Sequence, residues 1–176
     1  WGWMPKWELF GRETWTMEGD PAIPFIADTY LKGLRDFDIN TAYEAFTRSA
    51  NLPGKDNKMR PDNDPYLAKG YVPMGVYAAD ESGDNSVSHA LEYYIADYAL
   101  SRFAHALGKT ADARKYYARS LGYRHYYSKE SGTLRPLMQD GSFLKPFDPE
   151  AGADFSNAPA STRGLPGTTP STCRTT

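Results

Sequence analysis

The stretch SVSHALEYYIADYALSRFAHAL, residues 86–107, decides the fold that this sequence predicts. Its apolar residues recur at spacings of three and four, which is the period of one face of an α-helix. Gly108 follows directly, and glycine is common just after the end of a helix. We therefore expect a long amphipathic helix from about Ser86 to Leu107. Its expected apolar face consists of Val87, Ala90, Leu91, Tyr94, Ile95, Tyr98, Ala99, Phe103 and Ala106.

Three further helices are predicted by the same spacing. The pair Asp20-Pro21 is typical of a helix start, with the acid as N-cap and proline in the first turn. A short helix fits residues 40–50, and another begins at Thr110 and ends before Gly132. Their expected apolar positions are Ile23, Ile26, Ala27, Tyr30, Leu31 and Leu34 in the first, Ala42, Tyr43, Ala45, Phe46 and Ala50 in the second, and Ala113, Tyr116, Tyr117, Leu121, Tyr126 and Tyr127 in the third.

The segments between these helices are long and irregular in pattern. Residues 1–19, 51–80 and 132–158 carry neither a helical period nor a convincing strand alternation. Long connections in a compact domain usually have a function or are ordered by their neighbours. The sequence therefore predicts an all-α protein with long, aromatic and proline-rich loops.

Composition excludes several classes of protein. The chain has 176 residues, enough for one domain, and a net charge of −2, which argues against a nucleic-acid binder. No apolar run approaches the roughly 18 residues of a membrane span. The one cysteine, Cys173, lies near the end, so residues 1–158 hold no disulfide and no cysteine-based metal site. Because the chain opens on WGWMPKWELF without an initiator Met, we expect it to be an internal part of a longer protein.

Two architectures use paired helices of this kind. The segment HALGKTADARKYYARS, residues 105–120, resembles the turn of a tetratricopeptide repeat, which would make the chain a helical interaction scaffold. No second copy follows at the period of about 34 residues that such repeats have. The alternative is an (α/α) barrel, in which paired helices surround a pocket and long loops at one end build the site. The long loops favour the barrel.

A series of short motifs then occurs in order along the chain. They are KWEL (6–9), GRET (11–14), MEG (17–19), IADTYLKG (26–33), AYEA (42–45), GYVP (70–73), SVS (86–88), LEY (91–93), ALGKT (106–110), LRP (134–136), DGSF (140–143) and PFDP (146–149). Each motif alone is weak, but their order and spacing over residues 1–158 resemble glycoside hydrolase family 92, the calcium-dependent exo-α-mannosidases.

The resemblance implies both a fold and an activity. Family members have an N-terminal β-sandwich and a C-terminal (α/α)₆ barrel that share one active site, so residues 1–158 would be roughly the first half of the barrel. The β-sandwich and the remaining half of the barrel are expected in cis, as other parts of the same polypeptide. The family removes terminal α-mannose from glycans with inversion, using one carboxylic acid and one carboxylate base. Calcium contacts the sugar hydroxyls, and the parent protein would be secreted or periplasmic.

The resemblance assigns no catalytic or metal-binding residue in this chain. The acid of the family lies in an E-G-N-A-W motif after PFDP, and the base and calcium ligands come later, so we expect all of them outside this chain. Glu92, in LEY, is expected to line the pocket, or else to be a solvated helix residue with a partner three or four positions away, such as His89. The other candidates for substrate binding are Trp7, as a sugar platform or else a packing residue, and Glu13 and Thr14 in the loop before Asp20. The alternative for Glu13 is a surface acid in a capping role.

Other polar residues have plainer interpretations. We expect Asp97 to be an acid on a helix face and Arg135 to have a structural role. The three histidines, His89, His105 and His125, form no pair at a spacing of four, which argues against a zinc site.

The end of the chain, PASTRGLPGTTPSTCRTT at residues 159–176, has no aromatic residue. Regrouping possible codons of this stretch by one base gives G-F-H-E-G-P-A-W-N-Y-T-F-Y-V-P, where the family has G-F-H-E-G-N-A-W-N-Y-T. Leu165 cannot regroup to Asn in any codon. We therefore predict a frame shift near Pro159, with the family's acid encoded beneath Thr162 and Arg163; the alternative is a genuine disordered tail.

With the acid, base and calcium ligands missing, we expect the chain alone to be inactive. A tetratricopeptide-like scaffold and another (α/α)₆ glycosidase, acting for example on glucosides, remain as alternative functions.

Overall fold

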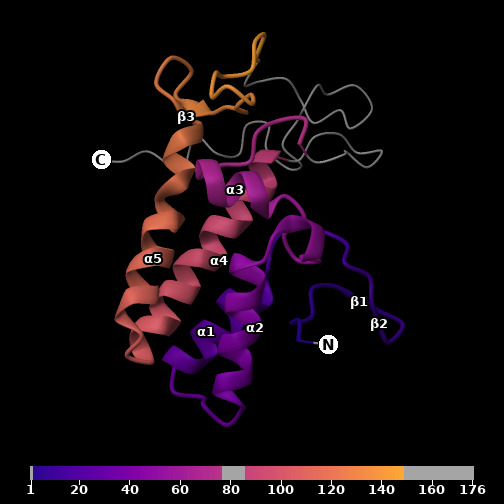
Figure 1. Ribbon diagram of the computed structural model, residues 1–176, viewed down its shortest axis with the longest axis vertical. Helices are drawn as coiled ribbons and strands as arrows, with labels where there is room; N and C mark the ends of the chain where they lie inside the picture. The colour runs from indigo at the N-terminus through magenta and orange to yellow at the C-terminus, as the bar shows by residue number, and fades with distance from the viewer. Residues whose placement is uncertain (1, 77–85, 149–176) are drawn as a thin grey trace.

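The computed structural model describes residues 2–76 and 86–148, and this part of the chain is rich in helix (Figure 1). The α-helices of the described part are α1 (Ala22–Leu31), α2 (Ile39–Asn51), α3 (Asn63–Lys69), α4 (Ser86–Ala106) and α5 (Thr110–Ser120). Short 3₁₀ helices occupy η1 (Gly54–Asp56) and η2 (Leu121–Tyr126). Two antiparallel ladders join β1 (Glu8–Leu9) to β2 (Arg12–Glu13), and β3 (Tyr127–Ser128) to β4 (Thr133–Leu134).

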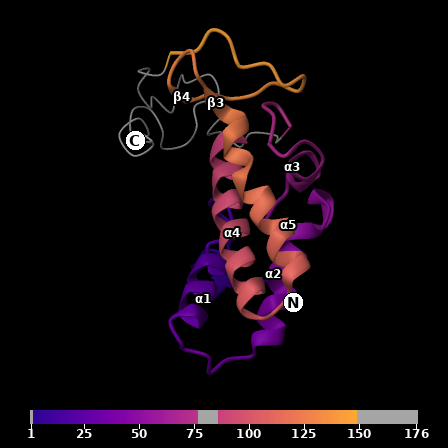
Figure 2. The same cartoon turned by 90° about the vertical axis from the view of Figure 1, so that its left-hand side faces the viewer.

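Helices α4 and α5 lie side by side along the long axis of the molecule (Figures 1 and 2). The turn between them is made possible by Gly108, whose φ of +75° is the left-handed conformation that favours glycine. The N–H of Lys109 bonds the carbonyl of Ala104 at 2.9 Å and closes this turn. The prediction of a long helix over residues 86–107, followed by a stop at Gly108, is confirmed.

One hydrophobic core lies where α1 and α2 pack against α4 and α5. Phe103 on α4 is completely buried at its centre. The rings of Tyr30 and Phe46 lie 5.0 Å and 5.6 Å from the Phe103 ring, in edge or tilted geometry that aromatic pairs prefer. In this core α1, α2 and α5 contribute buried residues that pack with those of α4.

A second core is built largely from tyrosines near the start of α4. The buried rings of Tyr66, Tyr94 and Tyr126 pack with Val72. The hydroxyl of Tyr126 accepts from the backbone N–H of Val72 at 2.9 Å and donates to its carbonyl at 2.8 Å. Tyr94 donates to the carbonyl of Gly70 at 2.6 Å. These hydroxyls satisfy backbone groups of the loop after α3 that would otherwise be buried without partners.

The predicted apolar faces need correction. On α4, Ile95 and Tyr98 are about half-exposed, whereas Tyr93, which was left off the face, is completely buried. Helix α1 ends at Leu31, which is exposed, and Leu34 beyond it is exposed to 68%. The other expected apolar positions that lie exposed are Ala106, Tyr117 and Tyr127. The helix that was predicted to continue to Gly132 ends at Ser120, where η2 and then β3 follow.

Two local predictions in the first half of the chain are wrong. Asp20 does not cap α1, because Pro21 precedes the helix and the Asp20 carboxylate turns toward Arg60 instead. The stretch 51–80 is not wholly a loop, since it contains η1 and α3. Helix α3 has proline in its first turn and ends at Gly70 with φ of +79°, so both of its ends follow ordinary helix chemistry.

Among residues 2–76 and 86–148, no helix combines the length and the apolar character that crossing a membrane requires. Residues 159–176, for which the frame shift was predicted, lie outside the described residues.

Candidate functional site

The hairpin of β1 and β2 brings three of the four predicted site residues together. Both oxygens of the Glu13 carboxylate accept backbone N–H groups: Lys6 donates at 2.6 Å, and Trp7 and Trp15 each donate at 2.9 Å. Thr14 donates its hydroxyl to the carbonyl of Trp7 at 2.8 Å. The indole of Trp7 remains half-exposed. Glu13 and Thr14 therefore hold the backbone at Trp7 in place.

Backbone hydrogen bonds favour the ionised form of Glu13. Slight burial opposes ionisation, but the N–H groups of Lys6, Trp7 and Trp15 lower the pKa of Glu13 below its usual value. A carboxylate has about four acceptor positions, and the N–H of Trp7 is shared between both oxygens, at 2.9 Å and 3.1 Å. The backbone therefore takes up most of the hydrogen-bonding capacity of this side chain.

Glu92, the fourth predicted residue, lies on α4 beneath the N-terminal segment. Gly19 is buried against it: a β-carbon added at Gly19 would lie 2.5 Å from the Glu92 Cβ. Partial desolvation, followed by the charges of Glu18 and Asp20, raises the pKa of Glu92, and the charge of Lys6 opposes this rise. The structure thus places Glu92 beside the segment that leads back to the hairpin.

Lys6 links the hairpin to this region. Its backbone N–H bonds Glu13, and its ammonium donates to the carbonyl of Met59 at 3.4 Å. Burial lowers the pKa of Lys6, while nearby acids, Asp20 and Glu18 foremost, act in the opposite direction. Lys6 therefore brings a positive charge into an otherwise acidic region.

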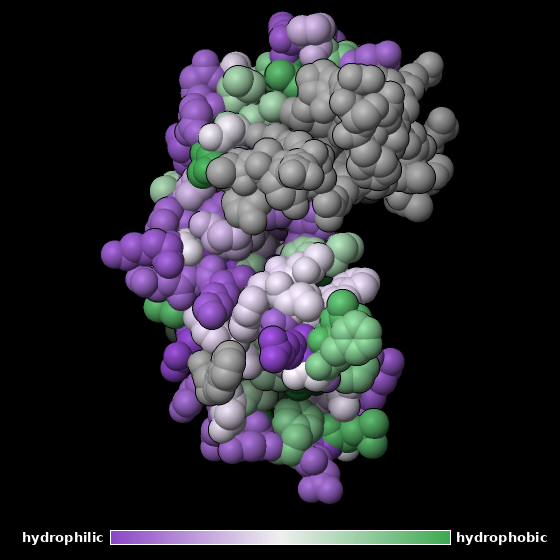
Figure 3. Space-filling model, turned by 90° about the vertical axis from the view of Figure 1, so that its right-hand side faces the viewer, coloured by the Kyte–Doolittle hydropathy of each residue, from purple (hydrophilic) through white to green (hydrophobic). Residues whose placement is uncertain are grey.

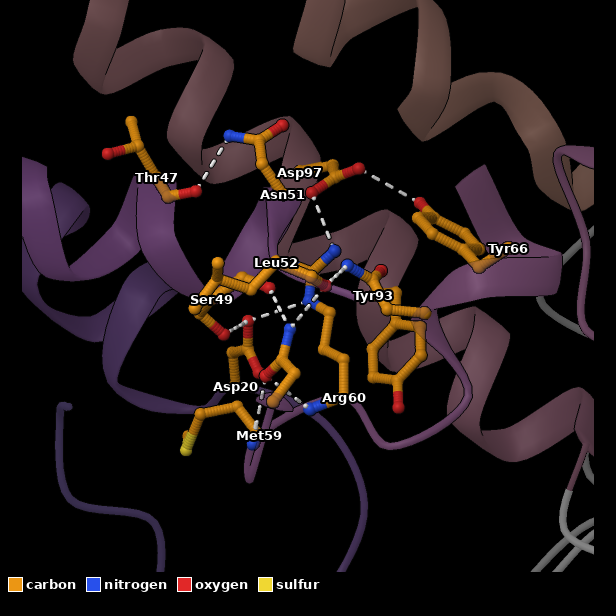
Figure 4. A network of polar contacts seen from close by, with 12 residues as sticks. Asp20, Thr47, Ser49, Asn51, Leu52, Met59, Arg60, Tyr66, Tyr93 and Asp97 are labelled. Atoms are coloured by element: carbon orange, nitrogen blue, oxygen red, sulfur yellow. Dashed lines mark hydrogen bonds and ion pairs between the residues drawn. The ribbon is translucent and has the colours of Figure 1, made fainter. Parts of the chain in front are cut away.

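A buried polar network lies below this surface, with Arg60 between Asp20 and Asp97 (Figure 4). The Arg60 Nε lies 2.8 Å from an Asp20 oxygen, and its Nη1 lies 3.0 Å from an Asp97 oxygen. Arg119 Nε also bonds Asp97, at 2.7 Å, and Tyr66 donates to it at 2.9 Å. The side chains of Asp20, Arg60 and Asp97 are essentially inaccessible to solvent.

The prediction that Asp97 is an ordinary acid on a helix face is therefore wrong. Its position is explained by α4 itself, because Tyr93, Asp97 and Leu100 follow one another at spacings of four and three and lie on the same buried face. That spacing is a signal in the sequence. Its partners carry no such signal: Arg60 is 37 residues earlier, and its place in the fold follows only from the packing.

A second buried acid, Asp62, joins two side chains of α4. His89 Nδ1 lies 2.9 Å from one Asp62 oxygen, and the hydroxyl of Tyr93 donates to the other. Burial, then the charge of Asp62, raises the pKa of Tyr93 well above its ordinary value. His89, the partner that the alternative interpretation gave as an example for Glu92, thus bonds Asp62, and Glu92 itself is exposed.

Arg135 has the structural role that was predicted. Its buried guanidinium donates to the carbonyl of Leu144 at 2.7 Å and pairs with Glu130 at 3.1 Å. It also lies 5.3 Å and 5.1 Å from the ring centres of Phe143 and Phe147. These contacts fasten the loop that follows β4.

Within the described ranges, no three side chains of His, Cys, Asp or Glu gather in a way that could hold a metal. The acids of this region are instead bonded to arginine, tyrosine and backbone N–H groups. No chemical step through a metal is therefore assigned to these residues.

Comparison with known proteins gives a consistent result. The model of the glycosyl hydrolase family 92 catalytic domain matches residues 1–165. An inverting family 92 mannosidase from Bacteroides thetaiotaomicron superposes on 85% of this chain with a TM-score of 0.73 and 28% identity, over 20% of its own length. A family 92 α-mannosidase from the same bacterium, solved with mannoimidazole, superposes on 85% of this chain with a TM-score of 0.72 and 32% identity, over 18% of its length.

A curated relative agrees with this result. A protein of Arthroderma benhamiae described as an uncharacterized secreted glycosidase is 28% identical over 134 residues, which are 73% of this chain and 17% of the relative. The chain thus spans only about a fifth of the length of the proteins that it matches. Family match, helix arrangement and motif order converge, and the chain belongs to glycosyl hydrolase family 92, a family of glycosidases.

Proposed function

We propose that this chain is part of the catalytic domain of an inverting, exo-acting α-mannosidase that removes terminal α-mannose from glycans. The observation that carries the proposal is the likeness to the two Bacteroides mannosidases, with TM-scores of 0.73 and 0.72 at 28% and 32% identity. Identity at this level over 85% of the chain supports more than a shared helix arrangement.

Helices α1 to α5 of the described residues would belong to roughly the first half of an (α/α)₆ barrel. A β-sandwich and the remaining half of the barrel would complete the enzyme in cis, and would carry the acid, the base and the calcium ligands. The small share of the relatives that the chain covers, 20% and 18%, supports this view. The chain alone would then lack the groups for hydrolysis, which need a carboxyl pair about 6.5–9.5 Å apart for inversion.

The predicted substrate-binding residues divide into two kinds by their contacts. Trp7 is half-exposed, and its ring can stack on the apolar face of a sugar. Glu92 is exposed and can accept hydrogen bonds from sugar hydroxyls. Direct binding by Glu13 and Thr14 stays a prediction, and the backbone bonds that they make favour support of Trp7 as their role.

The parent protein is proposed to be exported. This follows from the Arthroderma relative, which is described as secreted, and it concerns the parent rather than any feature of the described residues. Family membership argues against the tetratricopeptide scaffold. The alternative is a glycosidase with specificity for another sugar, and the experiment must distinguish it from an α-mannosidase.

The test uses the complete gene product that contains this chain. It is assayed on matched α-mannoside, β-mannoside and α-glucoside substrates, and the first-formed sugar is followed by proton NMR. We expect release of mannose from the α-mannoside only, with β-mannose as the initial product. Release of glucose would favour the alternative glycosidase, and α-mannose as initial product would contradict inversion.

The predicted frame shift near Pro159 is tested separately. The source DNA is sequenced through this region and several hundred bases beyond. We expect the neighbouring frame to encode the E-G-x-A-W segment and further barrel sequence. A DNA sequence that encodes the tail as written, with no barrel sequence in any frame, would contradict the frame shift.

A further inference from the structure

We propose that Arg60 is a positioning residue that sets Trp7 on the N-terminal hairpin and Glu92 on α4 in a common place for the sugar. This inference rests on the proposed function. Trp7 and Glu92 lie 85 positions apart in the sequence. They can therefore bind one sugar only if the segments that carry them are held in a fixed position relative to each other. Arg60 contacts both the N-terminal segment, through Asp20, and α4, through Asp97.

The first contact of Arg60 holds the N-terminal segment. Its Nε bonds Asp20 at 2.8 Å, and Asp20 also accepts the hydroxyl of Ser49 on α2 at 2.7 Å. Asp20 directly follows Gly19, the residue that lies against Glu92. A shift of Asp20 therefore shifts the backbone at the point where the N-terminal segment crosses α4.

The second contact of Arg60 holds α4. Its Nη1 bonds Asp97 at 3.0 Å, five positions after Glu92 on the same helix. The guanidinium also lies 4.8 Å from the ring centre of Tyr93, the neighbour of Glu92. The Arg60 guanidinium thus contacts two residues of α4 that lie one turn apart, Tyr93 and Asp97. Figure 4 shows it between Asp20 and Asp97.

Arg60 is itself held firmly. Its side chain has no exposed area, and it lies in the connection between η1 and α3. Its backbone N–H bonds the side-chain oxygen of Asn57 at 3.0 Å, and the Asn57 amide donates to the carbonyl of Ser49 at 2.7 Å. A buried arginine with this support can transmit position, since its planar group keeps its geometry.

Stability alone is a poor explanation of such a network. Taking charges out of water is costly, and a well-packed apolar substitute is often equally stable. The presence of a buried ion pair is better explained when the pair favours one arrangement of the chain over others. In this protein the selected geometry is the placement of the N-terminal segment on α4.

Arg119 offers a matched control. Its Nε and Nη2 bond Asp97 at 2.7 Å and 3.1 Å, so it supports the same acid as Arg60. Among the residues that the structure describes, its other contacts are with Asn51 and with the rings of Tyr66 and Tyr116, which lie outside the N-terminal segment, and its side chain is partly exposed, at 17%. Replacement of Arg119 therefore perturbs Asp97 while leaving the bond between Arg60 and Asp20 in place.

The experiment compares Arg60→Lys, Asp20→Asn and Arg119→Lys in the complete gene product. Arg60→Lys and Asp20→Asn are expected to raise KM for an α-mannoside by about tenfold or more, since small misplacements of binding groups have effects of this size. Arg119→Lys is expected to lower the melting temperature with KM within about twofold of the parent. Equal changes in KM for Arg119→Lys and Asp20→Asn, or unchanged KM in Asp20→Asn, would overturn the proposal.

A second readout does not depend on the activity. Amide hydrogen exchange is measured over residues 6–19 in the same proteins. Faster exchange is expected there for Arg60→Lys and Asp20→Asn but not for Arg119→Lys. If the parent releases no mannose yet exchange changes as expected, the proposed function fails while the role of Arg60 in placing the segment stands. Unchanged amide exchange over residues 6–19 in Asp20→Asn would overturn that role. Asp20→Asn gives this answer even if Arg60→Lys fails to fold.

Discussion

Gly19 lies so close to Glu92 that a β-carbon at position 19 would be 2.5 Å from the Cβ and 3.0 Å from the Cγ of that glutamate. Gly19 also has a φ of +77°, which side chains rarely adopt. Both features occur where the N-terminal segment crosses α4, so this one residue sets how closely the segment with Trp7 approaches the helix with Glu92.

The substitution Gly19→Ala should therefore destabilise the protein for two reasons. The positive φ costs about 1–2 kcal/mol for a side chain, and the contact with Glu92 adds a steric cost of about 1–3 kcal/mol. The measurement is chemical denaturation. Gly11→Ala is the control, because Gly11 has a φ of +71° with nothing within 4 Å of an added β-carbon. Equal losses of stability in the two variants would show that the close contact has no energetic role.

Glu92→Gln should stabilise the protein at neutral pH and leave it unchanged in acid. The pKa of Glu92 is raised in the folded protein above the reference of 4.5, chiefly by desolvation, then by Glu18 and Asp20. Ionisation of Glu92 therefore costs stability as the pH rises through its folded pKa, and glutamine cannot ionise.

The gain should be below about 1 kcal/mol, because Glu92 is only partly desolvated and water screens the charges of its neighbours. Thermal melts of both proteins at pH 7 and below pH 4 measure it. The exposed Glu44 on α2, changed to Gln, is the control. A gain that persists below pH 4 would refute an electrostatic origin.

Glu13→Gln should loosen the hairpin of β1 and β2. Glutamine has one acceptor oxygen, whereas the carboxylate accepts N–H groups from Lys6, Trp7 and Trp15 with both of its oxygens. We expect a local loss of about 1 kcal/mol, observed as faster amide exchange at Trp7 and Trp15. Glu8→Gln changes the residue that pairs with Glu13 across the ladder and serves as control. The pKa of Glu13 is lowered, so the wild-type hairpin should loosen in the same way as the pH falls through that pKa.

An internal water is expected beside the Asp20–Arg60 ion pair. Within the described part of the chain, Asp20 Oδ1 and Arg60 Nη2 are buried without a hydrogen-bond partner. One is an acceptor and the other a donor, and buried groups of this kind are commonly satisfied by ordered water. A crystal structure at high resolution should show a water within 3.2 Å of both atoms. A dry contact would instead mean that the two atoms are left unsatisfied.

Exposed apolar residues on α1 and after it should cause self-association of the chain when it is made alone. Phe25 is 73% exposed and Leu34 is 68% exposed. Apolar side chains also gather on the lower part of the face drawn in Figure 3. Phe25→Asp should shift the chain toward monomer in sedimentation analysis. Thr29→Asp adds the same charge one turn later on α1 and should shift the chain toward monomer less. Equal shifts in the two variants would mean that the added charge, and not the loss of the Phe25 side chain, reduces self-association.

Much of the helix arrangement follows from the sequence, because apolar spacing acts locally. The predicted helix over 40–50 is α2, which begins after Asp38, whose carboxylate accepts the N–H of Thr41 at 3.0 Å. Helix α3 was missed because it has only seven residues and lies within a proline-rich stretch. So short a segment has little periodicity, and it is held by tertiary contacts such as the buried Tyr66.

The polar network could not be predicted in the same way. Asp20 looked like an N-cap because its neighbours in sequence are those of a helix start, but an arginine 40 residues away binds its carboxylate. Asp97 could have been found from its place on the buried face of α4. Of the predicted site, Glu13, Thr14 and Trp7 are brought together by a short ladder whose two-residue strands give no alternation to detect.

The most direct test of the central claim compares two proteins on one α-mannoside: the complete gene product and this 176-residue chain. The account predicts release of mannose by the complete protein and none by the chain, because we propose that the acid, the base and the calcium ligands lie in the rest of the complete protein. Release of mannose by the purified chain alone, or failure of the well-folded complete protein to release mannose from any α-mannoside, would contradict it.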